Sequence, residues 1–138
     1  SIALLSYRNG HAYNIRQTET DVNKTSDFKA SSYQNYQGDK LIKRFNAYSY
    51  HLITRMMDTH NLGRGRGSAE EALARIKART LAVGVSSDIL FPPEELRFIA
   101  ENVINGEYVE IDSPFGHDGF LVESEQISEI VHKFYQKQ

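Results

Sequence analysis

The sequence has 138 residues and no cysteine, which excludes disulfide bonds, thiolate metal sites and a cysteine nucleophile. It has almost no excess charge, since 16 Lys and Arg stand against 18 Asp and Glu. Nucleic-acid-binding proteins normally carry a basic excess, so we expect no nucleic-acid partner. No apolar run approaches the roughly 20 residues that cross a membrane. Residues 1–8 also lack the features of a signal peptide. We therefore expect a cytoplasmic protein without membrane attachment.

Motifs for metal and phosphate binding are missing as well. No His-x-x-x-His or His-Glu-x-x-His spacing occurs, so we expect no metal site. The glycine- and arginine-rich run at 63–67 lacks the spaced glycines and the lysine of a P-loop. This run could offer backbone N–H groups and two cations, Arg64 and Arg66, to a phosphate, or it could simply connect two helices. The sequence leaves both interpretations open.

The first half of the chain has a helical pattern. Residues 2–7 are typical of a packed helix, and the polar residues from 11 to 29 predict a surface loop. Between 31 and 62, apolar residues recur every three to five positions, which predicts two or three helices. We expect an N-cap at Ser31 or Ser32 and interruptions near Gly38 and at 46–47.

The apolar positions between 31 and 62 form a stripe rich in Tyr and Met. Its members are Tyr33, Tyr36, Leu41, Phe45, Tyr48, Leu52, Met56 and Met57. Such a stripe is consistent with core or helix-to-helix packing, or with the surface of a lid or dimer. A capping box at Ser68 and Glu71 then predicts a further helix that extends to about Lys77.

From residue 80 the pattern becomes that of an α/β protein. Residues 80–85 are a short apolar run rich in β-branched side chains, which predicts a buried strand. A helix opened by two prolines at 92–93 follows, then a strand at 108–111, a loop at 113–119 and a final helix. The order strand, helix, strand, helix predicts an α/β fold. Two parallel strands cannot form a sheet covered on both faces, so we expect further strands from elsewhere or a larger parent protein.

Each predicted strand is followed by a titratable residue. Asp88 lies three residues after Val85, and His117 lies six residues after Ile111. Functional groups of open α/β sheets lie at the carboxyl ends of strands, so adjacent strands would bring these two residues together. An aspartate beside a histidine fixes the imidazole tautomer and makes the histidine a general base. Two unrelated surface residues explain the same pattern equally well.

The remaining four histidines have no comparable setting, and we expect them on the surface. They are His11, His51, His60 and His132.

An aspartate followed by a histidine is the second half of an α/β-hydrolase triad, whose serine comes first in a Gly-x-Ser-x-Gly motif. No such motif occurs in this sequence, so we expect the nucleophile to lie outside it. The first residue is Ser1 rather than Met, which is consistent with a processed or truncated end.

Several stretches of the sequence together resemble the homoserine O-acetyltransferase family. Residues 32–41, 44–50 and 58–67 resemble its lid helices, 79–95 the segment with its catalytic aspartate, and 116–123 the segment with its catalytic histidine. The resemblance implies an α/β class protein: the C-terminal part of an α/β-hydrolase fold, preceded by a helical lid. It implies a lid region at 1–78 and a core segment at 79–138.

The resemblance also implies a reaction, the transfer of an acetyl group from acetyl-CoA to the hydroxyl of L-homoserine in methionine biosynthesis. A serine acyl-enzyme would form, with acetyl-CoA as co-substrate and no cofactor. His117 would be the base and acid, and Asp88 would orient it. Asp118 would contact the amino group of the substrate, and Tyr7 would lie beside the substrate. The arginine that binds the substrate carboxylate falls just before Ser1.

The resemblance further implies a homodimer formed through the lid helices. Without a nucleophile, we expect the chain to be inactive alone. Three alternatives remain open: a succinyl-CoA-dependent enzyme, an esterase of the same fold, and a non-catalytic lid or dimerisation module.

Overall fold

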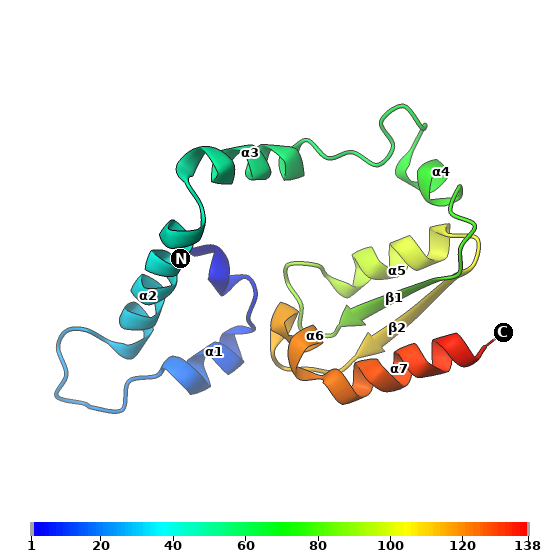
Figure 1. Cartoon of the computed structure of the whole chain (residues 1–138). Helices are drawn as coiled ribbons and strands as arrows, with labels where there is room; N and C mark the ends of the chain where they lie inside the picture. The colour runs from blue at the N-terminus through cyan, green and yellow to red at the C-terminus, as the bar shows by residue number, and fades with distance from the viewer. Residues whose placement is uncertain (1, 138) are drawn as a thin grey trace.

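The computed structural model describes residues 2–137. Ser1 and Gln138, the outer ends of the predicted lid region and core segment, lie outside the described residues. Helices α1 to α3 lie at one side of the molecule, and a small sheet with its own helices lies at the other (Figure 1). In order the elements are η1 (Ile2–Leu5), α1 (Gly10–Gln17), α2 (Lys29–Arg44), α3 (Ala47–Asp58), α4 (Ala69–Leu73), β1 (Thr80–Val85), α5 (Pro93–Asn102), β2 (Gly106–Ile111), η2 (Gly116–Asp118), α6 (Gly119–Val122) and α7 (Ser124–Gln136).

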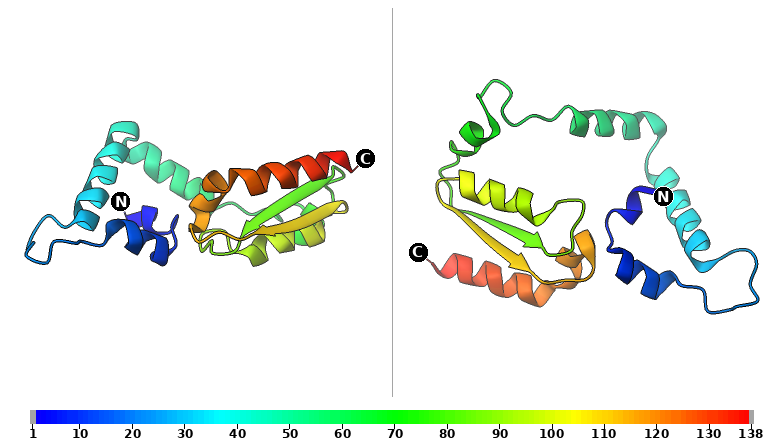
Figure 2. Two further views of the ribbon diagram at one scale, coloured as in Figure 1. Left: turned by 90° about the horizontal axis from the view of Figure 1, so that it is seen from below. Right: turned by 180° about the vertical axis from the view of Figure 1, so that it is seen from behind.

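The two strands form a parallel sheet, which confirms the predicted α/β order. β1 and β2 pair in register from Thr80 opposite Gly106 to Val85 opposite Ile111. Helix α5 connects them and covers one face of the sheet, and α7 lies on the other face (Figure 2). The buried apolar side chains at this end include Ala82 and Val85 of β1, Ala100 of α5 and Ile111 of β2, whereas α7 has no buried residue. The carboxyl ends of both strands point toward α1 (Figure 1).

Strand β2 begins at Gly106, two residues before the predicted start at 108. A Cβ atom at this glycine would lie 2.0 Å from the carbonyl oxygen of Ala100 in α5. Only glycine therefore lets the strand pass this close to the helix. The helix itself ends at Asn102, with Val103 as its C-cap.

The predicted loop from 11 to 29 is wrong at its start, because Gly10–Gln17 is helical. The side chain of Asn9 accepts a 2.8 Å hydrogen bond from the backbone N–H of His11 and caps this helix. One side of the helix buries Ala12, although its other residues are mostly polar. An N-cap and a single buried alanine accompany this helix, although its mostly polar composition predicts a loop.

The ends of the predicted lid helices also differ in part. Helix α2 begins at Lys29, so Ser31 and Ser32 lie inside it and do not cap it, and Gly38 does not interrupt it. The predicted break at 46–47 is confirmed, because Asn46 Oδ1 accepts a 2.8 Å hydrogen bond from the Ser49 N–H and caps α3. Residues Ile2–Leu5 form a 3₁₀ helix with no buried residue, rather than a packed α-helix.

Two predicted helices are shorter than expected. The N-cap half of the predicted capping box is confirmed, since Ser68 Oγ accepts from the Glu71 N–H at 3.2 Å, but α4 stops at Leu73 instead of Lys77. Beyond it, the N–H of Ile76 bonds three residues back to Leu73, which tightens the chain out of the α-helix. The predicted final helix is divided into α6 and α7 at Glu123.

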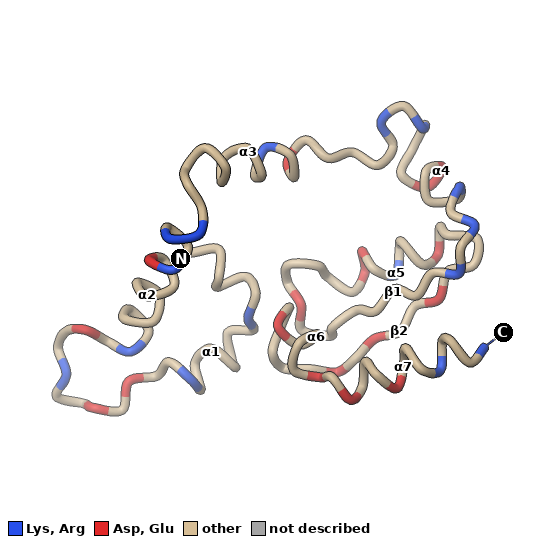
Figure 3. Tube along the Cα trace, viewed as in Figure 1, with Lys and Arg blue, Asp and Glu red and all other residues tan. Residues whose placement is uncertain are grey.

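The apolar stripe on α2 and α3 does not form a core among the described residues. No residue of either helix is buried, and Tyr48 is 88% exposed. Figure 3 shows that α3 carries charged residues only near its end, at Arg55 and Asp58. The stripe is therefore not a core of this chain, although Tyr33 packs against Tyr13 of α1, as helix-to-helix packing predicts. The interpretation as a lid or dimer surface stays a prediction.

None of the described helices combines the length and the apolar character needed to cross a membrane.

Candidate active site

Asp88 lies in the turn that follows β1, and the backbone of that turn holds its carboxylate. The residue is 7% exposed. Its Oδ1 atom accepts hydrogen bonds from the N–H groups of Leu90 at 2.8 Å and Phe91 at 3.1 Å. Its own N–H donates to the carbonyl of Val85 at 3.0 Å. These contacts fix the carboxylate and leave Oδ2 pointing toward the loop after β2.

His117 meets Asp88 at this point, as the positions of the two strand ends predict. His117 Nδ1 lies 2.8 Å from Asp88 Oδ2. A carboxylate oxygen can only accept, so the hydrogen must lie on Nδ1 and the other ring nitrogen, Nε2, is then an acceptor in neutral imidazole. The histidine side chain is 24% exposed, compared with 5% for the aspartate. The pair therefore presents a proton-accepting nitrogen at the surface of the described chain.

Three aromatic rings surround the imidazole. The ring centroids of Phe91 and Phe120 each lie 5.1 Å from that of His117, and the centroid of Tyr7 lies 5.7 Å away. Phe91 follows β1, Phe120 belongs to α6, and Tyr7 comes from the segment before α1. These rings pack beside the imidazole and restrict its rotation.

The loop that carries His117 needs a glycine to reach the segment before α1. Gly116 is buried and has φ +65°, a conformation that other residues rarely adopt. A Cβ atom here would lie 2.7 Å from the backbone nitrogen of Asn9. The N–H of Asp118 donates to the carbonyl of Tyr7 at 3.0 Å. The two segments thus pack backbone against backbone.

Serine hydroxyls tie the loops after the two strands together. Ser86 Oγ donates to Asp112 Oδ1 at 2.9 Å and accepts from the Ser113 N–H at 3.2 Å. Ser87 Oγ donates to the Ser113 carbonyl at 2.6 Å and accepts from the Gly116 N–H at 2.9 Å. Sequence reasoning missed these serines. The strand register could have indicated them. Val85 pairs with Ile111, so continuing the register beyond the strands places residue 86 opposite 112 and residue 87 opposite 113.

Asp118 and Tyr7, the other two predicted site residues, lie next to the histidine. Asp118 follows it in η2, and Tyr7 is 36% exposed with its ring beside the imidazole. Arg8, which sequence reasoning did not single out, donates from Nε to Asp118 Oδ2 at 3.0 Å. Its guanidinium also lies 5.3 Å from the centre of the Tyr33 ring. Arg8 therefore connects α2, the segment before α1 and the histidine loop.

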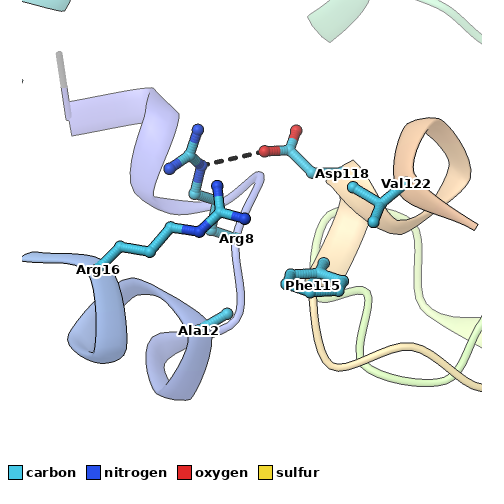
Figure 4. Close-up of a pocket in the computed structure, with 6 residues that line it drawn as sticks. All are labelled: Arg8, Ala12, Arg16, Phe115, Asp118 and Val122. Carbon is cyan, nitrogen blue, oxygen red and sulfur yellow. Dashed lines mark hydrogen bonds and ion pairs between the residues drawn. The ribbon is translucent and has the colours of Figure 1, made fainter.

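A small pocket opens beside this ion pair (Figure 4). Its lining comes from the first part of the chain and from the region around η2: Arg8, Ala12, Arg16, Phe115, Asp118 and Val122. The guanidinium of Arg16 lies 5.8 Å from the centre of the Phe115 ring. The pocket thus combines one carboxylate and two cations at the boundary between the two parts of the molecule.

The other candidate ligands lie elsewhere. His11, His51, His60 and His132 are exposed, as predicted. Within residues 2–137, no three His, Asp or Glu side chains are grouped as a metal site requires.

The guanidinium groups of the glycine- and arginine-rich run bind backbone carbonyls. Arg64 donates to the carbonyl of Thr59 at 2.7 Å, and Arg66 to that of Leu62 at 3.1 Å. Gly65 and Gly67 have positive φ values of 71° and 97°. These contacts favour the interpretation of the run as a connecting loop.

Comparison with known proteins gives one consistent set of relatives, although no family model matches the chain. The sequence is 49% identical over 135 residues to a homoserine O-acetyltransferase of Cyclobacterium marinum, covering 98% of this chain and 38% of that protein. It is 43% identical over 135 residues to a homoserine O-acetyltransferase of Thermus thermophilus, covering 96% of this chain and 33% of that protein. The chain therefore spans between a third and two fifths of the length of these relatives.

A solved structure gives the same result for the fold. The crystal structure of homoserine O-acetyltransferase from Bacillus anthracis matches with a TM-score of 0.84, covering 99% of this chain and 39% of that chain. At 19% sequence identity, this likeness establishes the fold alone. The described chain thus has the architecture of part of an α/β-hydrolase.

Proposed function

We propose that this chain is the part of a homoserine O-acetyltransferase that supplies the acid–base pair and the lid, because it is 43–50% identical to segments of proteins with that name. The carrying observation is the 2.8 Å contact between His117 Nδ1 and Asp88 Oδ2. The proposed reaction moves an acetyl group from acetyl-CoA to the hydroxyl of L-homoserine. The nucleophile is a serine that belongs to the part of the relatives this chain does not cover.

His117 is the group that moves protons in this proposal. Its Nε2 accepts the proton of the serine hydroxyl as the serine oxygen attacks the thioester carbonyl of acetyl-CoA. It returns that proton to the departing thiolate of CoA, which leaves an acetyl-serine. In the second half, Nε2 accepts the proton of the homoserine hydroxyl as this oxygen attacks the acetyl group. The proton then returns to the serine, and O-acetyl-homoserine is released.

Asp88 supports each of these steps without exchanging a proton itself. Its charge stabilises the imidazolium that forms twice per turnover, and its contact with Nδ1 selects the tautomer. The two backbone donors to Oδ1 hold the carboxylate in place throughout. The low exposure of the aspartate excludes water that would weaken this interaction.

Asp118 and Tyr7 are the proposed contacts of the amino-acid substrate. An ammonium group requires an anionic partner, and Asp118 is the anion nearest in sequence to the acid–base histidine. Arg8 binds Oδ2 of this residue and so orients the carboxylate. The ring of Tyr7 lies beside the imidazole and forms a wall of the substrate site.

The exposed apolar stripe supports a homodimer. Tyr48, Leu52, Met56 and Met57 of α3 are 60–88% exposed, and Tyr and Met are enriched at protein interfaces. We propose that a second copy covers them. We also propose a cytoplasmic enzyme that needs no cofactor beyond acetyl-CoA as co-substrate.

The test is an assay of the complete protein that carries this segment. With acetyl-CoA and L-homoserine, it should release the CoA thiol and form O-acetyl-homoserine, while the 138-residue chain alone should give no release above background. Faster turnover with succinyl-CoA than with acetyl-CoA would show that the acyl donor is succinyl-CoA. Hydrolysis of acyl esters without any dependence on homoserine would favour the esterase. A complete protein that performs none of these reactions would contradict the proposal.

A further inference from the structure

Ser87 occupies a position between the two members of the acid–base pair. It precedes Asp88 in the turn after β1, and its side chain reaches across to the loop after β2. There its hydroxyl accepts from the Gly116 N–H at 2.9 Å and donates to the Ser113 carbonyl at 2.6 Å. Gly116 immediately precedes His117. One hydroxyl group therefore connects the residue before the aspartate to the residue before the histidine.

The backbone of the histidine loop depends on this hydroxyl. Gly116 is buried and is the first residue of η2, so its N–H has no acceptor within that helix. A buried N–H without an acceptor is strongly unfavourable. Ser113 is only 1% exposed, and the hydroxyl of Ser87 also satisfies its carbonyl. Both hydrogen bonds would be lost together without the Ser87 hydroxyl.

We infer that Ser87 is a positioning residue, which sets the distance and angle between His117 Nδ1 and Asp88 Oδ2 by fixing the backbone of Gly116. The inference rests on the proposed function, because it assigns Ser87 to the same acid–base pair. Ser87 does not contact the imidazole, so its effect passes through the peptide between Gly116 and His117. The carbonyl of the same peptide accepts from the Gly119 N–H, and the following peptide donates from the Asp118 N–H to the Tyr7 carbonyl.

Ser86 provides a matched control in the neighbouring position. Its hydroxyl also makes two hydrogen bonds to the loop after β2, to Asp112 and Ser113. It makes none to Gly116. Removing either hydroxyl loses two hydrogen bonds to the loop after β2 and so lowers the stability of the fold for the same reason. Only the loss of the Ser87 hydroxyl removes the acceptor of the Gly116 N–H.

The experiment compares Ser87→Ala, Ser87→Thr and Ser86→Ala in the complete protein. We expect Ser87→Ala to lower kcat about tenfold with the KM for homoserine changed less than about twofold, since it disturbs the transition state rather than substrate binding. The acidic limb of the kcat–pH profile should move as well. Ser86→Ala should keep kcat and the pH profile, and Ser87→Thr, which retains the hydroxyl, should restore most of the activity.

A spectroscopic measurement separates this inference from the proposed function. The Nδ1–H proton of a histidine bonded to a carboxylate gives a low-field proton NMR signal. We expect Ser87→Ala to shift or broaden this signal and Ser86→Ala to leave it in place, whether or not the protein acetylates homoserine. An unchanged signal and unchanged kcat in folded Ser87→Ala would overturn the inference. So would a folded Ser87→Thr that is as impaired as the alanine variant.

Discussion

Arg8 donates a hydrogen bond from Nε to Asp118 Oδ2 over 3.0 Å, although 110 residues separate them in the chain. The two side chains are only partly exposed, at 23% and 32%. The contact joins the helical first part of the chain to the loop that holds His117. Binding of the substrate and the position of the first helices should therefore be coupled.

We expect Asp118→Ala in the complete protein to raise the KM for homoserine about 10- to 100-fold, which corresponds to the loss of one charged hydrogen bond. Arg8→Ala should raise it less, because the carboxylate remains but loses its orientation. The two effects should not add in the double variant, since both act on one carboxylate.

Arg16→Ala is the control for these variants, because Arg16 lines the same pocket without an ion pair to Asp118. Its KM should stay close to that of the unchanged protein. An unchanged homoserine KM in Asp118→Ala would contradict the proposed substrate contact.

Substitutions of the acid–base pair should differ in severity. His117→Ala should abolish formation of the acetyl-enzyme, measured as the burst of free CoA, because it removes the nitrogen that accepts the serine proton in the proposed mechanism. Asp88→Asn should retain a small residual rate, since it changes the tautomer but leaves the base in place. His132→Ala should behave like the unchanged protein, because this exposed residue lies on α7. A normal burst in His117→Ala would refute the assignment.

Gly106→Ala should destabilise the sheet. The added Cβ would lie 2.0 Å from the Ala100 carbonyl oxygen, so α5 and β2 must move apart. We expect a loss of about 1–3 kcal/mol in the free energy of unfolding, seen as a lower midpoint in urea. Gly10→Ala is the control, because a Cβ at Gly10 meets no atom within 4 Å. Equal midpoints for the two variants would show that the sheet and helix can separate without cost.

The contacts of Glu107 predict a dependence of stability on pH. Hydrogen bonds from Lys137 and then Arg79 lower the pKa of this carboxyl below its ordinary value of 4.5. A lowered folded-state pKa adds stability above the unfolded value, and this stability is lost as the pH falls through the folded value. Glu107→Gln should therefore lower the Tm at pH 7 by a small amount, and the difference should shrink below about pH 4.5. The carboxyl is partly solvated, which keeps the effect modest. A difference that stays constant down to pH 2 would contradict the prediction.

Local patterns in the sequence were sufficient for the sheet region. An apolar β-branched run and a proline-opened helix are specified by neighbouring residues, and they predicted β1 and α5 closely. The same is true of Asp88 and His117, because parallel pairing places the ends of adjacent strands at one edge. Helix α1 was missed because its residues are mostly polar, and the N-cap at Asn9 was not recognised in the sequence.

Features that depend on distant contacts could not be predicted in this way. The role of Arg8 depends on a partner at the opposite end of the chain. The start of β2 depends on the approach of Ala100 to Gly106, which no local pattern records. The apolar stripe shows the limit most clearly, because its spacing indicates a helix face but not whether the chain itself covers that face.

The three rings around His117 make the NMR chemical shifts of this histidine sensitive to the position of the surrounding segments. Phe91 and Phe120 belong to the sheet region, whereas Tyr7 belongs to the segment before α1. The ring current of Tyr7 shifts the resonances of the imidazole protons only while that segment stays against the histidine loop. The chemical shifts of His117 would thus register each departure of the first helices, with no label attached to the protein.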